Sequence, residues 1–168
     1  MMRRTALLTA MLVAAWTVPA HADECEAMAA NVHAQNPEIA VADRSAQEQA
    51  VIVTLKNPDV EELTLTCATG NVDRPTELMA RAKATWPSSN FYDVVASAGA
   101  IVAANTSSAI RSGSVLCAQR AMASPDSNAI YDINNLHFAC TTTTGVGGET
   151  RIRISKFKTP APQEPSPQ

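Results

Sequence analysis

The chain has 168 residues, a formal net charge of −3 at pH 7 and an apolar content of 46%. This length is enough for one domain with a hydrophobic core. The acidic balance excludes nucleic acid as a partner class, because binding along phosphates requires a basic surface.

The N-terminus has the three parts of a secretory signal peptide in their usual order. A positive start, Arg3-Arg4, precedes the apolar run Leu7–Val18, and Ala20-His21-Ala22 is the small-x-small pattern that signal peptidase recognises. We therefore predict cleavage between Ala22 and Asp23. The alternative interpretation of these residues is a short helix buried in the core.

The predicted cleavage point also bears on membrane attachment. Asp23 and Glu24 separate it from Cys25, so we expect no lipid anchor, and no later apolar run is long enough for a membrane helix. The mature chain would keep 11 of 13 basic residues and all 16 acidic ones, a formal charge of 11 − 16 = −5. We expect a periplasmic or secreted protein, exported by the general bacterial route.

A first helix and three strands are predicted after the cleavage point. The helix covers Asp23–Asn36 and ends at Pro37. Its apolar residues recur at helical spacing: Cys25, Met28, Ala29 and Val32. In the strands, apolar and polar residues alternate. They are Glu38–Asp43, Gln49–Lys56 and Glu62–Thr69, with a turn at Asn57-Pro58-Asp59.

The middle of the chain has helical spacing. A helix is predicted from Asp73 to Trp86, ended by Pro87, because its apolar residues recur as Leu78, Met79, Ala82 and Trp86. Ser88 caps the next helix, whose apolar stripe is Phe91, Val94, Val95, Ala98, Ile101 and Val102. We expect that helix to break around Asn105–Ser108 and at Gly113, and to resume over Ser114–Ala123.

Three further strands complete the predicted domain: Ala129–Ile133, Leu136–Thr142 and Arg151–Phe157. The glycines of Gly145–Gly148 indicate a hairpin loop between the last two. Basic residues cluster here, and we interpret them as the charges of an edge strand. They are Arg151, Arg153, Lys156 and Lys158.

These elements predict three parts: a cleaved signal peptide (1–22), a single domain (23–158) and a disordered tail rich in proline (159–168). The expected fold class is α+β. We expect a single layer of mostly antiparallel sheet with five or six strands, helices packed on one face, and two disulfides.

The four cysteines all follow the predicted cleavage point, and an even number in an exported chain indicates two disulfides. Cys67 and Cys140 lie on the apolar faces of predicted strands, whereas Cys25 and Cys117 lie on predicted helices. Each strand cysteine should therefore bond a helix cysteine, which leaves two of the three connectivities. We favour Cys25–Cys67 with Cys117–Cys140, because each bond then joins elements close in sequence.

An internal similarity accompanies the strand cysteines. Leu63–Cys67 and Leu136–Cys140 share the pattern Leu-x-apolar-x-Cys at a spacing of 73 residues, which the helix cysteines do not share. The pattern fits either a diverged duplication of a helix-and-strands unit or two unrelated alternating strands.

No motif carries chemistry, so we predict no catalytic, cofactor-binding or metal-binding residues. After cleavage only His33 and His137 remain, and neither has a second ligand at a metal spacing or the partners of a catalytic triad. The chain has no G-x-S-x-G motif, and Gly145–Gly148 precedes a strand rather than the helix of a phosphate-binding loop.

The function favoured by the sequence is non-enzymatic: a small exported, disulfide-stabilised protein that binds another envelope protein or a small ligand. The alternative is a periplasmic hydrolase-like enzyme with a dispersed site near His137 and a neighbouring acid. A purely structural role is a third possibility. A deep pocket holding His137 beside a carboxylate or hydroxyl would favour the enzyme, and a flat or apolar exposed patch would favour binding.

Overall fold

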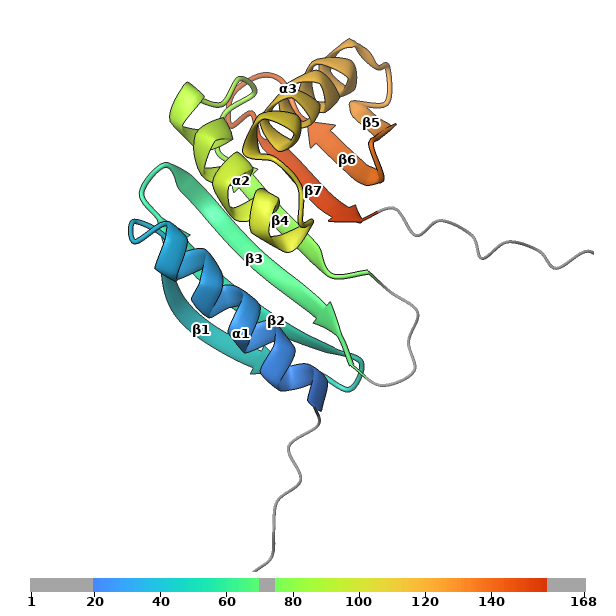
Figure 1. The fold of residues 1–168 in the computed structure, drawn as a ribbon. Coiled ribbons are helices and arrows are strands. Elements are labelled where there is room, and N and C mark those ends of the chain that lie inside the picture. The colour runs from blue at the N-terminus through green and yellow to red at the C-terminus, as the bar shows by residue number, and fades with distance from the viewer. Residues whose placement is uncertain (1–19, 70–74, 157–168) are drawn as a thin grey trace, which may run out of the picture.

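The computed structural model describes residues 20–69 and 75–156, which form three helices and one seven-stranded sheet (Figure 1). The elements, in chain order, are α1 (Ala20–Gln35), β1 (Ala40–Ala46), β2 (Ala50–Asn57), β3 (Val60–Ala68), β4 (Glu77–Ala82), α2 (Ser89–Val102), α3 (Ser107–Ala123), β5 (Asn128–Ile133), β6 (Leu136–Thr142) and β7 (Thr150–Lys156). Most of the predicted signal peptide, Phe157 and the predicted tail lie outside the described residues.

The predicted cleavage pattern falls at the start of α1, which begins at Ala20. A cut between Ala22 and Asp23 would therefore remove the first three residues of this helix and leave Cys25 within it. No helix in the described part of the chain is long and apolar enough to cross a membrane.

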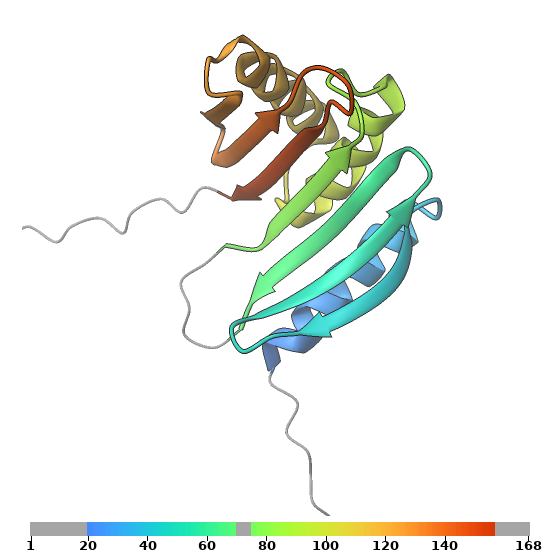
Figure 2. The ribbon, with the colours of Figure 1, turned by 180° about the vertical axis from the view of Figure 1, so that it is seen from behind.

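The sheet has the strand order β1-β2-β3-β4-β7-β6-β5, and every neighbouring pair is antiparallel. All three helices lie on one face, and the view from behind shows no helix in front of the other face (Figure 2). The α+β class and the antiparallel sheet are confirmed. The strand count differs from the expected five or six, and the helices add a second layer to the sheet.

The additional strand is β4, where the sequence analysis predicted a helix from Asp73 to Trp86; that prediction is wrong. Leu78 and Ala82 fit helical spacing, but with Ala80 they also alternate as a strand, and it is this alternating set that is buried. Both edges of β4 are paired, by β3 and β7. Trp86, which the helix would have placed in the core, is 62% exposed after the strand has ended.

The two later helices begin at side-chain caps. Ser88 Oγ accepts a hydrogen bond from the backbone N–H of Phe91 at 3.2 Å, as the sequence predicted, and Thr106 Oγ1 accepts one from Ala109 at 3.3 Å. The expected break near Asn105 separates α2 from α3.

The break expected at Gly113 is absent from α3, which continues through this residue. A Cβ at this position would lie 2.3 Å from Cζ of the Phe138 ring. The backbone of α3 at Gly113 therefore lies against this ring, and the missing side chain serves packing.

The core lies between the helices and the sheet and includes both disulfides. The Sγ atoms are 2.09 Å apart in Cys25–Cys67 and 2.06 Å apart in Cys117–Cys140, and these are the two pairs favoured from the sequence. Each bond joins a helix to a strand, because all four side chains point into the core, where none is more than 6% exposed.

The topology divides the sheet into two similar halves. We call α1 with β1–β4 (residues 20–82) the first half and α3 with β5–β7 (residues 107–156) the second half. In each, three consecutive strands (β2-β3-β4 and β5-β6-β7) form an antiparallel meander, and the two meet at β4 and β7 as a two-fold axis would relate them. Each helix is disulfide-bonded to the middle strand, at Cys67 or Cys140. This arrangement favours duplication over two unrelated strands.

Candidate functional site

One face of the sheet is not covered by helices, and we call it the open face. Its side chains alternate along each strand with the buried residues that face the helices. From β2 to β5 they include Ile52, Thr54, Glu62, Thr64, Thr66, Glu77, Met79, Arg81, Arg151, Arg153, Ser155, His137, Ala139, Ile130 and Asp132. Most are half-buried, because neighbouring side chains on the sheet shield one another.

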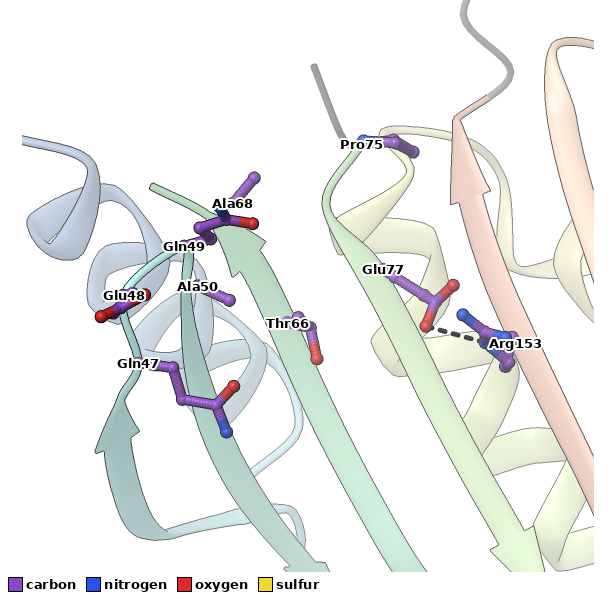
Figure 3. Close-up of a pocket in the computed structure, with 9 residues that line it drawn as sticks. All are labelled: Gln47, Glu48, Gln49, Ala50, Thr66, Ala68, Pro75, Glu77 and Arg153. Atoms are coloured by element: carbon purple, nitrogen blue, oxygen red, sulfur yellow. Dashed lines mark hydrogen bonds and ion pairs between the residues drawn. The ribbon is translucent and has the colours of Figure 1, made fainter. Parts of the chain in front are cut away.

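A pocket of about 710 Å³ lies at one end of this face. Figure 3 shows how four parts of the chain surround it: the turn between β1 and β2 with Gln47 and Gln49, then Thr66 on β3, Glu77 on β4 and Arg153 on β7. The turn is held by a hydrogen bond from the backbone N–H of Gln47 to the carbonyl of Ala50 at 2.8 Å. The pocket therefore depends on strands far apart in sequence.

The charged side chains of the open face are paired across strands. Arg153 Nε lies 2.9 Å from Glu77 Oε1, and Arg81 contacts both Glu62, at 2.8 Å, and Glu149, at 3.2 Å. The hydrogen bonds that Arg81 donates to these two carboxylates raise its pKa. These ion pairs join β3, β4 and β7. Glu77 and Arg153, which both line the pocket, are therefore paired with each other.

The strand order corrects the interpretation of Arg151 and Arg153 as charges of an edge strand. Their strand, β7, lies inside the sheet between β4 and β6. The edge interpretation failed because β4, the neighbour of β7, was not recognised as a strand. Arg151 Nη2 pairs with Glu149 at 3.1 Å, and Arg153 pairs with Glu77.

Uncharged polar groups remain for recognition at the pocket. Among the described residues, the side-chain amides of Gln47 and Gln49 and the hydroxyl of Thr66 are not used in hydrogen bonds within the fold. Each amide and hydroxyl can both donate and accept. The pocket is therefore suited to hydrogen bonding with a bound group.

A second cluster on the open face surrounds His137, the residue of the enzyme alternative. Its Nδ1 lies 2.6 Å from Asp132 Oδ1, with side chains 35% and 49% exposed. Ser155 is the partner of His137 on the neighbouring strand, so an acid, an imidazole and a hydroxyl lie in one row across β5, β6 and β7. His137 lines neither the pocket of about 710 Å³ nor a smaller one, of about 260 Å³, that lies over β5, β6 and β7.

The other histidine has a structural position. His33 Nδ1 lies 2.9 Å from the backbone carbonyl of Ile39, and this contact joins the end of α1 to the segment that leads into β1. In the described ranges, no cluster of three histidine, cysteine or acidic side chains could hold a metal ion.

Asp132 was not predicted as the acid beside His137, although the sequence carries a signal for it. Asn134 and Asn135 have φ of 49° and 61° and form a two-residue hairpin loop, for which two consecutive asparagines are well suited. Such a loop fixes the register so that Asp132 faces His137. No comparable signal identifies the residues of the large pocket, because they depend on β4.

Comparison of the chain with protein-family models, with curated proteins and with solved structures found no match.

Proposed function

We propose that the protein is a non-enzymatic binding protein that holds a partner protein against the open face. The observation that carries this proposal is the pocket of about 710 Å³, which opens on that face and presents the unused polar groups of Gln47, Gln49 and Thr66. Of its three charged groups, Glu77 and Arg153 pair with each other, and Glu48 lies on the exposed turn between β1 and β2. This chemistry suits hydrogen bonding to a partner better than proton transfer to a substrate.

The composition of the face favours a protein over a small molecule. Small-molecule sites are mostly apolar and enclose most of their ligand. This pocket is lined by polar and apolar surface in similar amounts and lies open at the end of the strands. Beyond it, the face mixes half-buried apolar side chains such as Ile52 and Met79 with paired charges, as protein interfaces do.

The compartment limits the partner. The two disulfides suggest a non-reducing, extracytoplasmic environment, because thiols in the cytoplasm are kept reduced. With the predicted signal peptide, this supports an envelope or secreted protein as the partner.

Affinity capture from the native periplasm or culture medium tests the proposal. Thr66→Arg fills the pocket with a long cationic side chain, whereas Gln119→Arg adds the same side chain on the exposed surface of α3. We expect the wild type and Gln119→Arg to retain the same protein at low salt, and Thr66→Arg to retain at least about tenfold less. Equal retention by both variants, or no retained protein, would contradict the proposal.

The row of Asp132, His137 and Ser155 favours a second candidate, a hydrolase that uses Ser155 as nucleophile and His137 as base. It ranks second because Ser155 is only 5% exposed and His137 lines neither the pocket of about 710 Å³ nor the one of about 260 Å³. A fluorophosphonate probe discriminates the two functions. Labelling of the wild type that is lost in Ser155→Ala would establish the hydrolase, and absence of labelling is expected for a binding protein.

A further inference from the structure

The two edges of the sheet differ in how they are protected from pairing with another strand. In the described residues, β1 and β5 each have a strand neighbour on one side only. β1 has an irregular register between Val41 and Asp43, and its Arg44 pairs with Glu26 of α1 at 2.7 Å. Bulges and charges of this kind prevent edge-to-edge association.

The β5 edge has little such protection. Its strand is regularly paired with β6 over all six residues and has one charged side chain, Asp132. Ile130 is 67% exposed on the open face, and Ile133 is 38% exposed on the helix face. An unprotected edge with exposed apolar side chains on both faces indicates a strand that pairs with another.

A groove lies beside β5 on each face of the sheet. On the open face, Ile130, Ala139 and Arg151 line a groove of about 260 Å³. On the helix face, Tyr131 and Leu116 line another of about 310 Å³. Successive side chains of a strand point to opposite faces, so a strand added to β5 would place alternate side chains beside Ile130 on the open face and beside Tyr131 on the helix face.

We propose that the occupant of this edge is β5 of a second copy of the chain, which makes the protein a symmetric dimer with a sheet that continues through both copies. Such an interface must be self-complementary. A two-fold axis perpendicular to the sheet makes the two β5 strands antiparallel and places residues of the same face opposite each other. The sequence numbers of two opposing residues, one from each copy, therefore always add to the same even value.

One register satisfies this condition with compatible side chains. When the pair numbers add to 260, Ile130 lies opposite Ile130 of the second copy, the amide of Asn128 lies opposite the carboxylate of Asp132, and the small Ala129 lies opposite Tyr131. The neighbouring register, with a sum of 262, places Ile130 against Asp132 and stacks Tyr131 on itself. Cross-strand apolar pairs and amide–carboxylate pairs stabilise a sheet, whereas an apolar side chain opposite a carboxylate does not.

The strength expected from this contact is modest. It pairs backbone groups of one six-residue strand and buries the two isoleucines at the centre, which is less than the surface buried in a permanent dimer. We therefore expect a reversible dimer with a dissociation constant on the order of micromolar. The proposal does not depend on the proposed function of the open face.

Sedimentation velocity over a concentration series tests the dimer. The wild type should change from the mass of one chain to that of two across the micromolar range. Ile130→Lys places two like charges opposite each other and should remain a monomer. Val41→Lys makes the same change at the other edge, where Val41 is 48% exposed, and should dimerise as the wild type does. Both sites are exposed, so circular dichroism should show unchanged folding.

Cross-linking tests the register. Ile130→Cys should form a disulfide between copies on mild oxidation, because residue 130 lies opposite itself. Ile133→Cys lies on the same strand but opposite residue 127, and should cross-link at least about tenfold more slowly. A monomer at all concentrations, a dimer unchanged by Ile130→Lys, or faster cross-linking through residue 133 would each overturn the proposal. A monomer would leave another protein's strand as the occupant of this edge.

Discussion

The two halves of the sheet share one plan but hold their helices differently. α1 is attached to the sheet through Cys25, Ala29 and Val32, three small buried side chains on a helix at the start of the described chain. α3 continues at both ends into other described elements, α2 and β5. It also packs at close range, with Gly113 against Phe138. The disulfide should therefore matter more for holding α1 on the sheet than for holding α3.

The largest effects should come from removing the disulfides, one pair at a time. The bonded cysteines are 42 residues apart in the first half and 23 apart in the second, so the chain-entropy argument gives roughly 4 and 3 kcal/mol of lost stability. Cys25→Ala/Cys67→Ala should also detach α1, whereas Cys117→Ala/Cys140→Ala should leave α3 in place. Hydrogen exchange measured by mass spectrometry would show this as faster exchange in residues 24–35 of the first variant only.

Comparable loss of protection over α1 and α3 in their respective variants would contradict this difference. It would show that each helix depends equally on its disulfide. Denaturant unfolding of both variants supplies the control, because it measures the global free energy of unfolding against which local exchange is compared.

How far the sequence predicts this fold can be seen from β4. Its six residues fit both the helical and the alternating period, so periodicity alone could not decide between them. The decision comes from β3 and β7, which pair with its two edges and lie far apart in sequence. The other six strands were predicted because each is longer or follows a turn with clear signals, such as Asn57-Pro58-Asp59.

The candidate site shows the same limit. Alternation within Leu136–Thr142 alone places His137 on the face opposite Cys140, and its half-exposed position agrees. The large pocket could not be predicted, since Thr66, Glu77 and Arg153 come together only when β4 lies between β3 and β7. Local pattern thus predicts which face a residue occupies, and strand pairing determines its neighbours.

The packing difference between the halves can be measured at Gly113. Gly113→Ala raises helix propensity by about 1 kcal/mol but forces a methyl group into the ring of Phe138, which is fully buried. Overpacking should prevail, with a net loss of about 1–2 kcal/mol in thermal or denaturant unfolding. Ser112→Ala, on the exposed surface of the same helix, is the control and should be neutral or slightly stabilising. A stabilised Gly113→Ala would show that the ring can move aside.

The junction between the halves can be tested at Arg81, which contacts Glu62 of the first half and Glu149 of the second. Arg81→Met keeps most of the side-chain volume and leaves both carboxylates without this partner. We expect the melting temperature to fall by a few degrees at low salt and by less at high salt, since salt screens the pairs. Arg44→Met, which breaks a single exposed pair with Glu26, should change it little. Equal falls in melting temperature for the two variants would show that contacting both halves gives Arg81 no extra effect on stability.

The smallest effect at neutral pH is expected at Tyr92 on α2, the helix that contacts both α1 and α3. Its hydroxyl is buried without a hydrogen-bond partner among the described residues, and burial raises its pKa. Tyr92→Phe should therefore be neutral or stabilising by about 0.5 kcal/mol at pH 7.

Alkaline pH separates this hydroxyl from its ring. Because the folded-state pKa lies above the unfolded value of about 10, the neutral phenol contributes stability that is complete below that value and is lost as the pH rises through the folded pKa. The wild type should lose stability above about pH 10 faster than Tyr92→Phe, which has no proton to release. Denaturant unfolding of both proteins at pH 7 and above about pH 10 measures the difference. If the free energy of unfolding fell equally with pH in the two proteins, the hydroxyl would be shown to reach water. α2 packs against both α1 and α3. Any change in hydrogen-exchange protection caused by Tyr92→Phe should therefore be equal in the two halves, unlike the change caused by removing either disulfide.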